Sequence, residues 1–347
     1  MHTFGYGFLK NICADSDIID RVMNIGVMNE RTKVIRLDHP QTALAMEKNA
    51  VMMSVIDSNA IEGIFTSMER ITGLINGRTA PIGHNEEEIV GYRDALKHIH
   101  SEHQRIRLNK EWILELYGIL MSHTLIEGLG FKDRDNIIVE RGGDGKIVKV
   151  HETVPADFTE ECIDQLLASY WEARNDVSIN KLLLIPCFVM DFLRIHPFRD
   201  GNGRMSRLMT VLLLYQEGYD ICRYVSMESK INGSKDRYYD ALELSEEGWF
   251  EDANDYMPFI SYFLDQLFLC YRELDKSLKA SVGDRTRSDA IEAFLRICMI
   301  PVSKSELCGM FPDLSETTIE RKLNDLMKEG RIERIGKSRG TRYIGIR

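Results

Sequence analysis

The stretch HPFRDGNGRMSR, residues 196–207, brings together side chains that could act on a phosphate. It contains His196, Asp200, Asn202, Arg204 and Arg207, with glycines at 201 and 203. The histidine is the group that could take a proton near neutral pH. Arginine forks bind phosphate oxygens, and a carboxylate suits a hard metal such as Mg²⁺ between phosphates. These residue types together predict a phosphate site with a metal ligand and a base, suited to attack on a nucleotide phosphate.

The backbone around this stretch is suited to hold an anion. An apolar run over 180–195 predicts a buried helix that ends at His196, because Pro197 disfavours helical geometry in the residue before it. The two glycines allow a tight turn, and a new helix is expected near 202–204 with unpaired N–H groups facing a ligand. A capped structural turn is the alternative, but the glycines, the asparagine and the arginines exceed what a cap requires. No GxxxxGK[ST] sequence occurs, which excludes a P-loop.

HPFRDGNGRMSR resembles the signature of the Fic family, HxFx[D/E]GNGRxxR, at every fixed position. The resemblance extends over roughly residues 40–275. Fic proteins mostly transfer AMP from ATP to a hydroxyl side chain of a target protein and release pyrophosphate. The resemblance therefore implies a protein adenylyltransferase that uses ATP as substrate and Mg²⁺ as cofactor. It also implies a mainly α fold, a Fic-type helical bundle with a β-hairpin flap.

The family also implies a role for each residue at the front of the signature. His196 would be the base that deprotonates a target Ser, Thr or Tyr, and Phe198 would anchor the loop in the core. Asp200 would hold Mg²⁺, and Asn202 would contact the α-phosphate.

The remaining positions would bind the rest of the nucleotide. Amides around Gly201 and Gly203 would line the anion hole, with Arg204 on the β-phosphate and Arg207 on the γ-phosphate. A kinase-like branch of the family has lysine at position 203, so glycine favours AMP transfer, although a phosphocholine-transferring relative shows that the motif alone does not fix the donor. Tyr239 would line the adenine pocket, while its position is equally compatible with a core aromatic.

The segment DSNAIEGI, residues 57–64, could regulate this site. Ser58 and Glu62 are four residues apart on one helix face, and Gly63 ends or loosens the turn. By chemistry alone a surface Ser–Glu pair is commonplace. The segment nevertheless resembles the inhibitory pattern [S/T]xxxE[G/N] of the self-inhibited Fic class, which implies an inhibitory helix at about 55–65. Glu62 would pair with Arg207, occupy its fork and repel the γ-phosphate. Some relatives also remove AMP from their targets. The resemblance therefore implies, as a hypothesis, that this chain does so too.

A hairpin interrupts the helical pattern. NIIVERGGDGKIVKVHETVP, residues 136–155, has two β-rich runs around Gly-Gly-Asp-Gly. An isolated hairpin is marginal in water, so it must lean on the bundle. A surface excursion is one interpretation. The resemblance implies the family's flap, on which a target protein docks by adding a strand.

The last segment, 285–347, predicts a small winged helix-turn-helix domain: three short helices and two strands around a basic tip. Ser303 and Glu306 form a capping box at the start of one helix. The basic residues that could contact DNA phosphates are Lys322, Lys328, Arg331, Arg334, Lys337, Arg339 and Arg342. Acidic residues share the recognition helix, so a protein partner or a dimer contact is an equal alternative.

Composition and charge set the broad class. The chain has 347 residues, is 44% hydrophobic and 28% charged, and carries a net charge of −10, as expected of a soluble globular protein. Residues 281–347 hold 13 lysines and arginines against 10 acidic residues, whereas the preceding 280 residues hold 31 against 44. An acidic body with a mildly basic tail suggests modules with different partners. We predict three regions: 1–109 with the inhibitory helix, 110–280 with the catalytic core, and 285–347.

The cysteine pattern and the apolar runs predict the cellular compartment of the protein. Seven scattered cysteines without a CxxC pair favour free thiols in a reducing compartment. We expect no signal peptide and no membrane-spanning run, and hence a cytoplasmic protein without membrane contact. A homodimer is expected only by analogy with Fic relatives.

Two functions compete at this point. One is an auto-inhibited adenylyltransferase. The other is a nucleotide-sensing, DNA-binding transcription regulator with little transferase activity. The intact His196 favours the enzyme, because a sensor needs phosphate ligands but no base.

Overall fold

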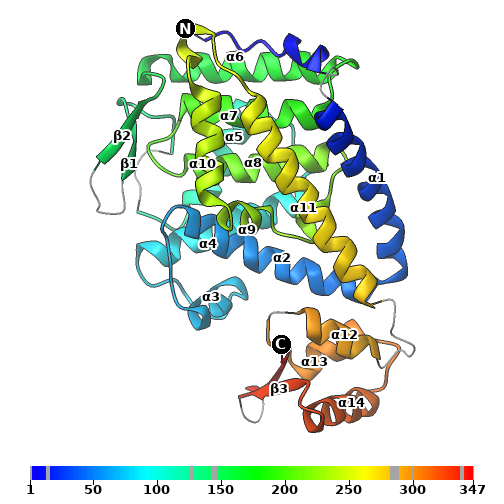
Figure 1. The fold of residues 1–347 in the computed structure, drawn as a ribbon. Coiled ribbons are helices and arrows are strands. Elements are labelled where there is room, and N and C mark those ends of the chain that lie inside the picture. Colours follow the sequence, from blue (N-terminus) through cyan, green and yellow to red (C-terminus); the bar gives the residue numbers. More distant parts are fainter. Residues whose placement is uncertain are drawn as a thin grey trace. The chain divides into compact units, whose positions relative to one another are not determined.

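The computed structural model describes residues 2–12, 16–125, 129–141, 147–281, 289–298, 300–336 and 340–346. The chain is mainly helical, as predicted (Figure 1). It divides into two units. The first comprises residues 1–22, 55–219 and 228–266, and the second comprises 23–54, 220–227 and 267–347.

The first unit contains the helices that surround the 196–207 stretch. They are η1 (Gly7–Lys10), α3 (Met68–Ile75), α4 (His84–Glu102), α5 (Lys110–Met121), α6 (Ala156–Asn175), α7 (Lys181–Ile195), α8 (Asn202–Gln216), α10 (Lys235–Glu246) and η4 (Trp249–Glu251). Four helices contribute residues to both units: α1 (Ser16–Asp38), α2 (Pro40–Ile61), α9 (Met227–Asn232) and α11 (Met257–Ser281).

Helix α7 forms the centre of the first unit. Its apolar sequence predicts burial on all sides, and all but two of its fifteen residues are buried. Helices α6, α8 and α10 pack against α7, and α4 and α5 pack against α8. Because α7 and α8 are both held by neighbours, the short loop between them is fixed at both ends.

The predicted hairpin is present beside this bundle (Figure 1). Strands β1 (Ile137–Arg141) and β2 (Ile147–Glu152) pair antiparallel, with Ile137 opposite Glu152 and an irregularity at Glu140/Arg141. The glycine-rich tip, 142–146, lies outside the described residues. Both ends of the hairpin are therefore placed next to each other at its base.

The second unit ends in the order of elements expected for a winged helix-turn-helix. Helices α12 (Asp289–Ile297), α13 (Lys304–Met310) and α14 (Glu316–Lys328) precede the antiparallel strands β3 (Ile332–Ile335) and β4 (Arg342–Gly345), while η3 (Ile221–Arg223) lies earlier in the chain. The capping box of Ser303 and Glu306 is confirmed. Phe294, Leu323 and other buried residues form one core. Two of the expected basic residues, 337 and 339, lie outside the described residues.

The described part of the chain contains six cysteines, and all six are free. Five are buried and Cys308 is half-buried, while Cys13 lies outside the described residues. Among the described helices, none combines the length and apolar composition that crossing a membrane requires.

Candidate active site

The loop between α7 and α8 follows the geometry predicted from Pro197 and the glycines. Helix α7 ends at Ile195, and His196 adopts a left-handed conformation with φ of 51°. Gly201 is also left-handed, with φ of 79°, and helix α8 begins directly after it. A non-glycine residue in this region is strained, and such strain persists where the surroundings impose it. The left-handed residues His196 and Gly201 thus turn the chain from α7 into α8.

His196 is in the protonation state that a base requires. Its Nδ1 lies 3.2 Å from the carbonyl oxygen of Leu193. A carbonyl can only accept, so Nδ1 carries the hydrogen and Nε2 keeps its lone pair. Burial, reinforced by the nearby Lys132 cation, lowers the pKa of His196 to about 4. The imidazole is therefore neutral at pH 7 and able to take a proton through Nε2.

Phe198 and Asn202 fasten the loop to the bundle. Phe198 is fully buried and stacks on Tyr117 with a ring separation of 3.8 Å. The Asn202 side chain accepts from the Phe198 amide at 2.9 Å and donates to the Phe198 carbonyl at 2.7 Å. Phe198 thus anchors the loop as expected. Asn202 braces it, a contribution that the sequence did not indicate.

Arg204 is buried at the start of α8 and is only partly satisfied. Its Nη2 donates to Glu88 at 2.9 Å and to Asp200 at 3.1 Å. Its Nε and Nη1 are buried and have no hydrogen-bond partner among the described residues. Buried donors without a partner are costly unless a ligand supplies an acceptor. The three N–H groups on these two nitrogens therefore suit an anion such as a phosphate oxygen.

Glu88 was missed by the sequence analysis. It lies on α4 and is 3% exposed. It belongs to a run of three glutamates that is easily explained as complementing a helix dipole. The run alone could not show that one of its members points inward to an arginine more than a hundred residues away.

Ser58, Glu62 and Arg207 meet as predicted. Arg207 donates from Nε to Ser58 Oγ at 2.8 Å, and from Nη2 to the Ser58 carbonyl at 2.9 Å and to Glu62 Oε1 at 2.7 Å. Although burial opposes its charge, the Glu62 carboxylate holds the pKa of Arg207 above its ordinary value. Helix α2 ends at Ile61, and Gly63 follows with φ of 79°. The Nε and Nη2 groups of the guanidinium are thus engaged by the end of α2.

Further contacts hold this end of α2 in place. The Asp57 carboxylate accepts from Ser229, and from Asn232 at 2.8 Å. Lys235 Nζ donates to the Ile61 carbonyl at 2.6 Å. Lys235 therefore satisfies one of the helix's terminal carbonyls, and its positive charge suits that end of the helix dipole.

Tyr239 lies near the Glu62–Arg207 pair. Its ring is 45% exposed, and Lys235 Nζ stands 5.9 Å from its centroid. Partial burial and the Glu62 charge raise the pKa of Tyr239 to about 12, while Arg207 opposes this shift. Tyr239 is therefore a surface aromatic at the edge of the site, and its half-exposed ring is available to a ligand. The neighbouring Tyr238 is the buried member of the pair.

Asp200 is exposed and carries the carboxylate closest to the start of α8 in sequence. The described residues contain no group of three histidines, cysteines or carboxylates that could hold a metal by themselves. A single carboxylate fits Mg²⁺, which is commonly held by one or two carboxylates, substrate phosphates and water.

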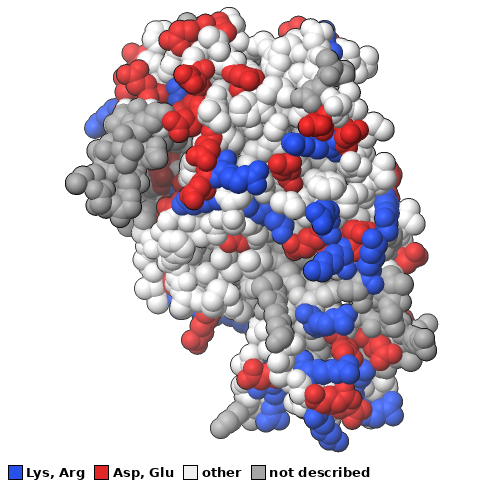
Figure 2. Space-filling view, in the orientation of Figure 1, with Lys and Arg blue, Asp and Glu red and all other residues white. Residues whose placement is uncertain are grey.

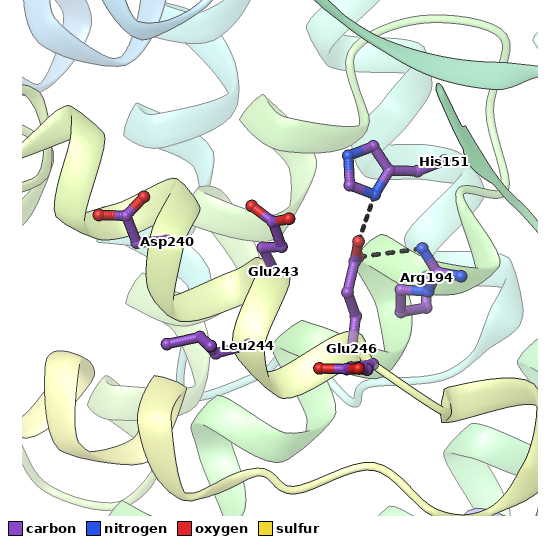
Figure 3. Close-up of a pocket in the computed structure, with 7 residues that line it drawn as sticks. His151, Arg194, Asp240, Glu243, Leu244 and Glu246 are labelled. Atoms are coloured by element: carbon purple, nitrogen blue, oxygen red, sulfur yellow. Dashed lines mark hydrogen bonds and ion pairs between the residues drawn. The ribbon is translucent and has the colours of Figure 1, made fainter. Parts of the chain in front are cut away.

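A separate pocket of about 670 Å³ lies beside the hairpin (Figure 3). It is lined by His151, Arg194, Asp240, Glu243, Leu244, Glu246 and Glu247. Glu246 accepts from Arg194 at 2.9 Å and also pairs with His151, so it links α7, α10 and β2. None of the residues expected to bind nucleotide lines this pocket. The predicted site is instead the loop and helix start described above.

Similarity to known sequences agrees with this geometry. A sequence model of the Fic/DOC family matches residues 107–214. The "Protein adenylyltransferase Fic" of Drosophila virilis is 26% identical over 257 residues, covering 70% of this chain and 48% of the relative. The protein of the same name from Aedes aegypti is 25% identical and covers 63% of this chain and 40% of the relative. The chain thus spans at most about half the length of these relatives.

Solved structures share the fold. A Fic family protein from Desulfovibrio desulfuricans G20 matches with a TM-score of 0.64 and 23% identity, covering 96% of both chains. A Fic domain containing signalling protein from Bacteroides thetaiotaomicron VPI-5482 matches with a TM-score of 0.62 and 21% identity, over 74% of this chain and 97% of that one. Residues 107–214 therefore match the Fic/DOC family model, and the chain shares its fold with solved Fic-family structures.

Proposed function

We propose that this protein is an auto-inhibited protein adenylyltransferase, which transfers AMP from ATP to a Ser, Thr or Tyr hydroxyl. One observation carries the proposal. The free Nε2 of a neutral His196 and the unpartnered donors of Arg204 belong to one loop and helix start. A base beside an anion cradle suits attack on a phosphate rather than binding alone.

The proposed reaction uses each part of the loop. His196 Nε2 takes the proton of the target hydroxyl, whose oxygen attacks the α-phosphorus. The bond from this phosphorus to the bridging oxygen breaks, and pyrophosphate leaves. The start of α8 and Arg204 stabilise the charge on the phosphates. Mg²⁺, held by Asp200 and phosphate oxygens, would neutralise that charge further.

Inhibition follows from the contacts of Arg207. Its fork is engaged by Ser58 and Glu62, so a γ-phosphate would have to displace a carboxylate that also repels it. We therefore infer that ATP binds the inhibited form without aligning its α-phosphate. The signal that releases Glu62 must break this contact.

The flap is the proposed docking surface for the target. Among the described residues its sheet has two strands, β1 and β2, so each strand has an edge that another strand could join. A target segment added there would present its hydroxyl toward the loop that carries His196.

Intact-mass spectrometry of the Glu62→Gly variant with ATP and Mg²⁺ tests donor, reaction and base together. We expect the mass to grow by one AMP through auto-modification, with little gain in the wild type. The Glu62→Gly/His196→Ala double variant should show no gain. If Glu62→Gly gains no mass and modifies no added protein, the proposed activity is wrong.

DNA binding by residues 285–347 is a second candidate function, and several contacts weaken it. Lys322 pairs with Asp289 at 3.0 Å, and Arg331 pairs with Glu292. Acidic and basic side chains are intermixed over this part of the molecule (Figure 2). Paired cations release fewer counterions from DNA. We therefore favour a protein partner for this segment, and a gel shift at two salt concentrations would reveal DNA binding by its steep salt dependence.

A further inference from the structure

A buried lysine lies between the flap and the base. Lys132 precedes β1 and is 3% exposed. Its Nζ donates to Asn136 Oδ1 at 2.8 Å, to Thr153 Oγ1 at 3.0 Å and to the Ile195 carbonyl at 3.0 Å. An ammonium group has three N–H donors. All three are therefore used, and each reaches a different segment of the chain.

Two of these acceptors mark the base of the flap. Asn136 immediately precedes β1, and Thr153 immediately follows β2. Thr153 Oγ1 also donates to the Asn136 carbonyl at 2.8 Å. One ammonium group thus holds both ends of the hairpin together.

The third acceptor belongs to the catalytic loop. Ile195 is the last residue of α7 and directly precedes His196. The backbone amide of Lys132 donates to the Pro197 carbonyl at 2.8 Å, and Asn136 Nδ2 donates to the Phe198 carbonyl at 3.0 Å. Lys132 therefore holds the carbonyls on both sides of the left-handed His196, and its partner Asn136 holds the next carbonyl along the loop, that of Phe198.

Retaining an ammonium group here has an energetic penalty. All three acceptors of Nζ are neutral oxygens. Burial lowers the pKa of Lys132 to about 8, which reflects the cost of keeping its charge away from water. A residue that served only to fill space would avoid this cost. The three directed hydrogen bonds indicate that Lys132 fixes the position of the flap base relative to the loop of His196.

We propose that Lys132 is a positioning residue that holds the flap, and any target strand on it, at a set distance and angle from His196. The proposal rests on the proposed adenylyltransferase function. Lys132 makes none of the hydrogen bonds that engage Arg204 or Arg207. Its loss should therefore misalign the target hydroxyl and leave the binding of ATP unchanged.

The test uses the full chain with Glu62→Gly as the parent. Adding Lys132→Met removes the three donors and keeps an unbranched side chain. We expect kcat for AMP transfer to a protein target to fall by about a hundredfold, the effect of a misplacement of about 1 Å. The Kd for a non-hydrolysable ATP analogue, measured by calorimetry, should stay within about twofold, because the substitution leaves the side chains proposed to bind the phosphates unchanged. Lys132→Arg should restore most of the rate, since its longer side chain carries a donor fork that can reach the same acceptors.

Two further variants keep the result interpretable. Thr153→Val removes one acceptor and should lower kcat by about tenfold, which tests the idea even if Lys132→Met does not fold. Lys110→Met is the control, because Lys110 pairs with Glu160 and Asp164 at the surface of α6, and it should leave kcat unchanged. An unchanged kcat in folded Lys132→Met, or a parallel loss of ATP affinity, would overturn the proposal.

An NMR titration of the His196 imidazole tests the link from Lys132 to His196 independently of the proposed adenylyltransferase activity. The Lys132 cation lowers the pKa of His196, so Lys132→Met should raise it and Lys132→Arg should not. This measurement needs no transferase activity. If the parent transfers no AMP but the pKa rises as expected, the proposed function is wrong while the link from Lys132 to His196 stands. An unchanged pKa in the methionine variant refutes the link.

Discussion

The Glu62 carboxylate lies against Gly203, in the first turn of α8: a Cβ built on Gly203 would overlap Glu62 Oε1. The same oxygen accepts from Arg207 Nη2 at 2.7 Å. Glu62 therefore covers the start of a helix where a phosphate would bind, in addition to engaging the arginine one turn further on. Absence of a side chain at 203 is a structural condition for this contact of Glu62.

Replacing Gly203 with alanine should weaken inhibition. Helical geometry at 203 accepts alanine, but the new methyl group must displace the Glu62 carboxylate. We expect labelled AMP incorporation by Gly203→Ala to exceed that of the wild type. In the Glu62→Gly background the same substitution should give no gain, because there is no carboxylate to displace. If Gly203→Ala raised AMP incorporation in both the wild-type and the Glu62→Gly backgrounds, alanine would be acting on the phosphate site itself.

Ser58→Ala should release the inhibitory contact in part. The substitution removes the acceptor of Arg207 Nε and leaves a buried charged donor unpaired. A hydrogen bond to a charged group contributes about 1.5–3 kcal/mol, so AMP incorporation should rise by about tenfold or more. The rise should remain below that of Glu62→Gly, because Glu62 still contacts Arg207. Ser101→Ala, at an exposed position of α4, is the matched control and should match the wild type.

The rate of AMP transfer should persist into mildly acidic solution. Burial lowers the pKa of His196 to about 4, so the base stays neutral from pH 8 down to about pH 5. In the Glu62→Gly variant this pKa should fall further, since the Glu62 charge opposes the shift. The measurement is kcat against pH, with circular dichroism confirming the fold at each pH. A decline centred near pH 6.5 would contradict the expected protonation state.

Asp191 should make stability depend on pH. It is fully buried and accepts from Tyr6, Tyr256 and Trp249. Burial raises the pKa of Asp191 to about 7, so between pH 4 and pH 7 the native state keeps a proton that the unfolded chain releases. This contribution to stability is present at low pH and is lost as the pH rises toward 7.

Urea unfolding of Asp191→Asn at pH 5 and pH 7 tests this. The wild type should lose about 2 kcal/mol more of its unfolding free energy over this interval than the variant loses. Asp157→Asn, at an exposed position of α6, should keep the wild-type dependence. Equal pH dependence in wild type and Asp191→Asn would show that Asp191 stays ionised in the native state.

Some features of this protein follow from neighbouring residues alone. Pro197 ends α7 at Ile195, and Gly201 turns the chain into α8. Ser303 and Glu306 cap α13 as their spacing predicts. Such features are local, because steric limits on the backbone and hydrogen bonds across one helical turn decide them.

The HPFRDGNGRMSR stretch alone determined which residues could bind phosphate and which could take a proton, because those capacities belong to side-chain chemistry. The resemblance of residues 57–64 to the inhibitory pattern of the self-inhibited Fic class also indicated that Glu62 would pair with Arg207. Periodicity could not show that Glu88 turns inward to Arg204, or that Lys132 joins the flap to the loop of His196. Only the packing of α4 against α8, and of the flap base against the end of α7 and the loop after it, decided these contacts. They join segments distant in the chain, and their hydrogen bonds replace those to water that each charge loses on burial.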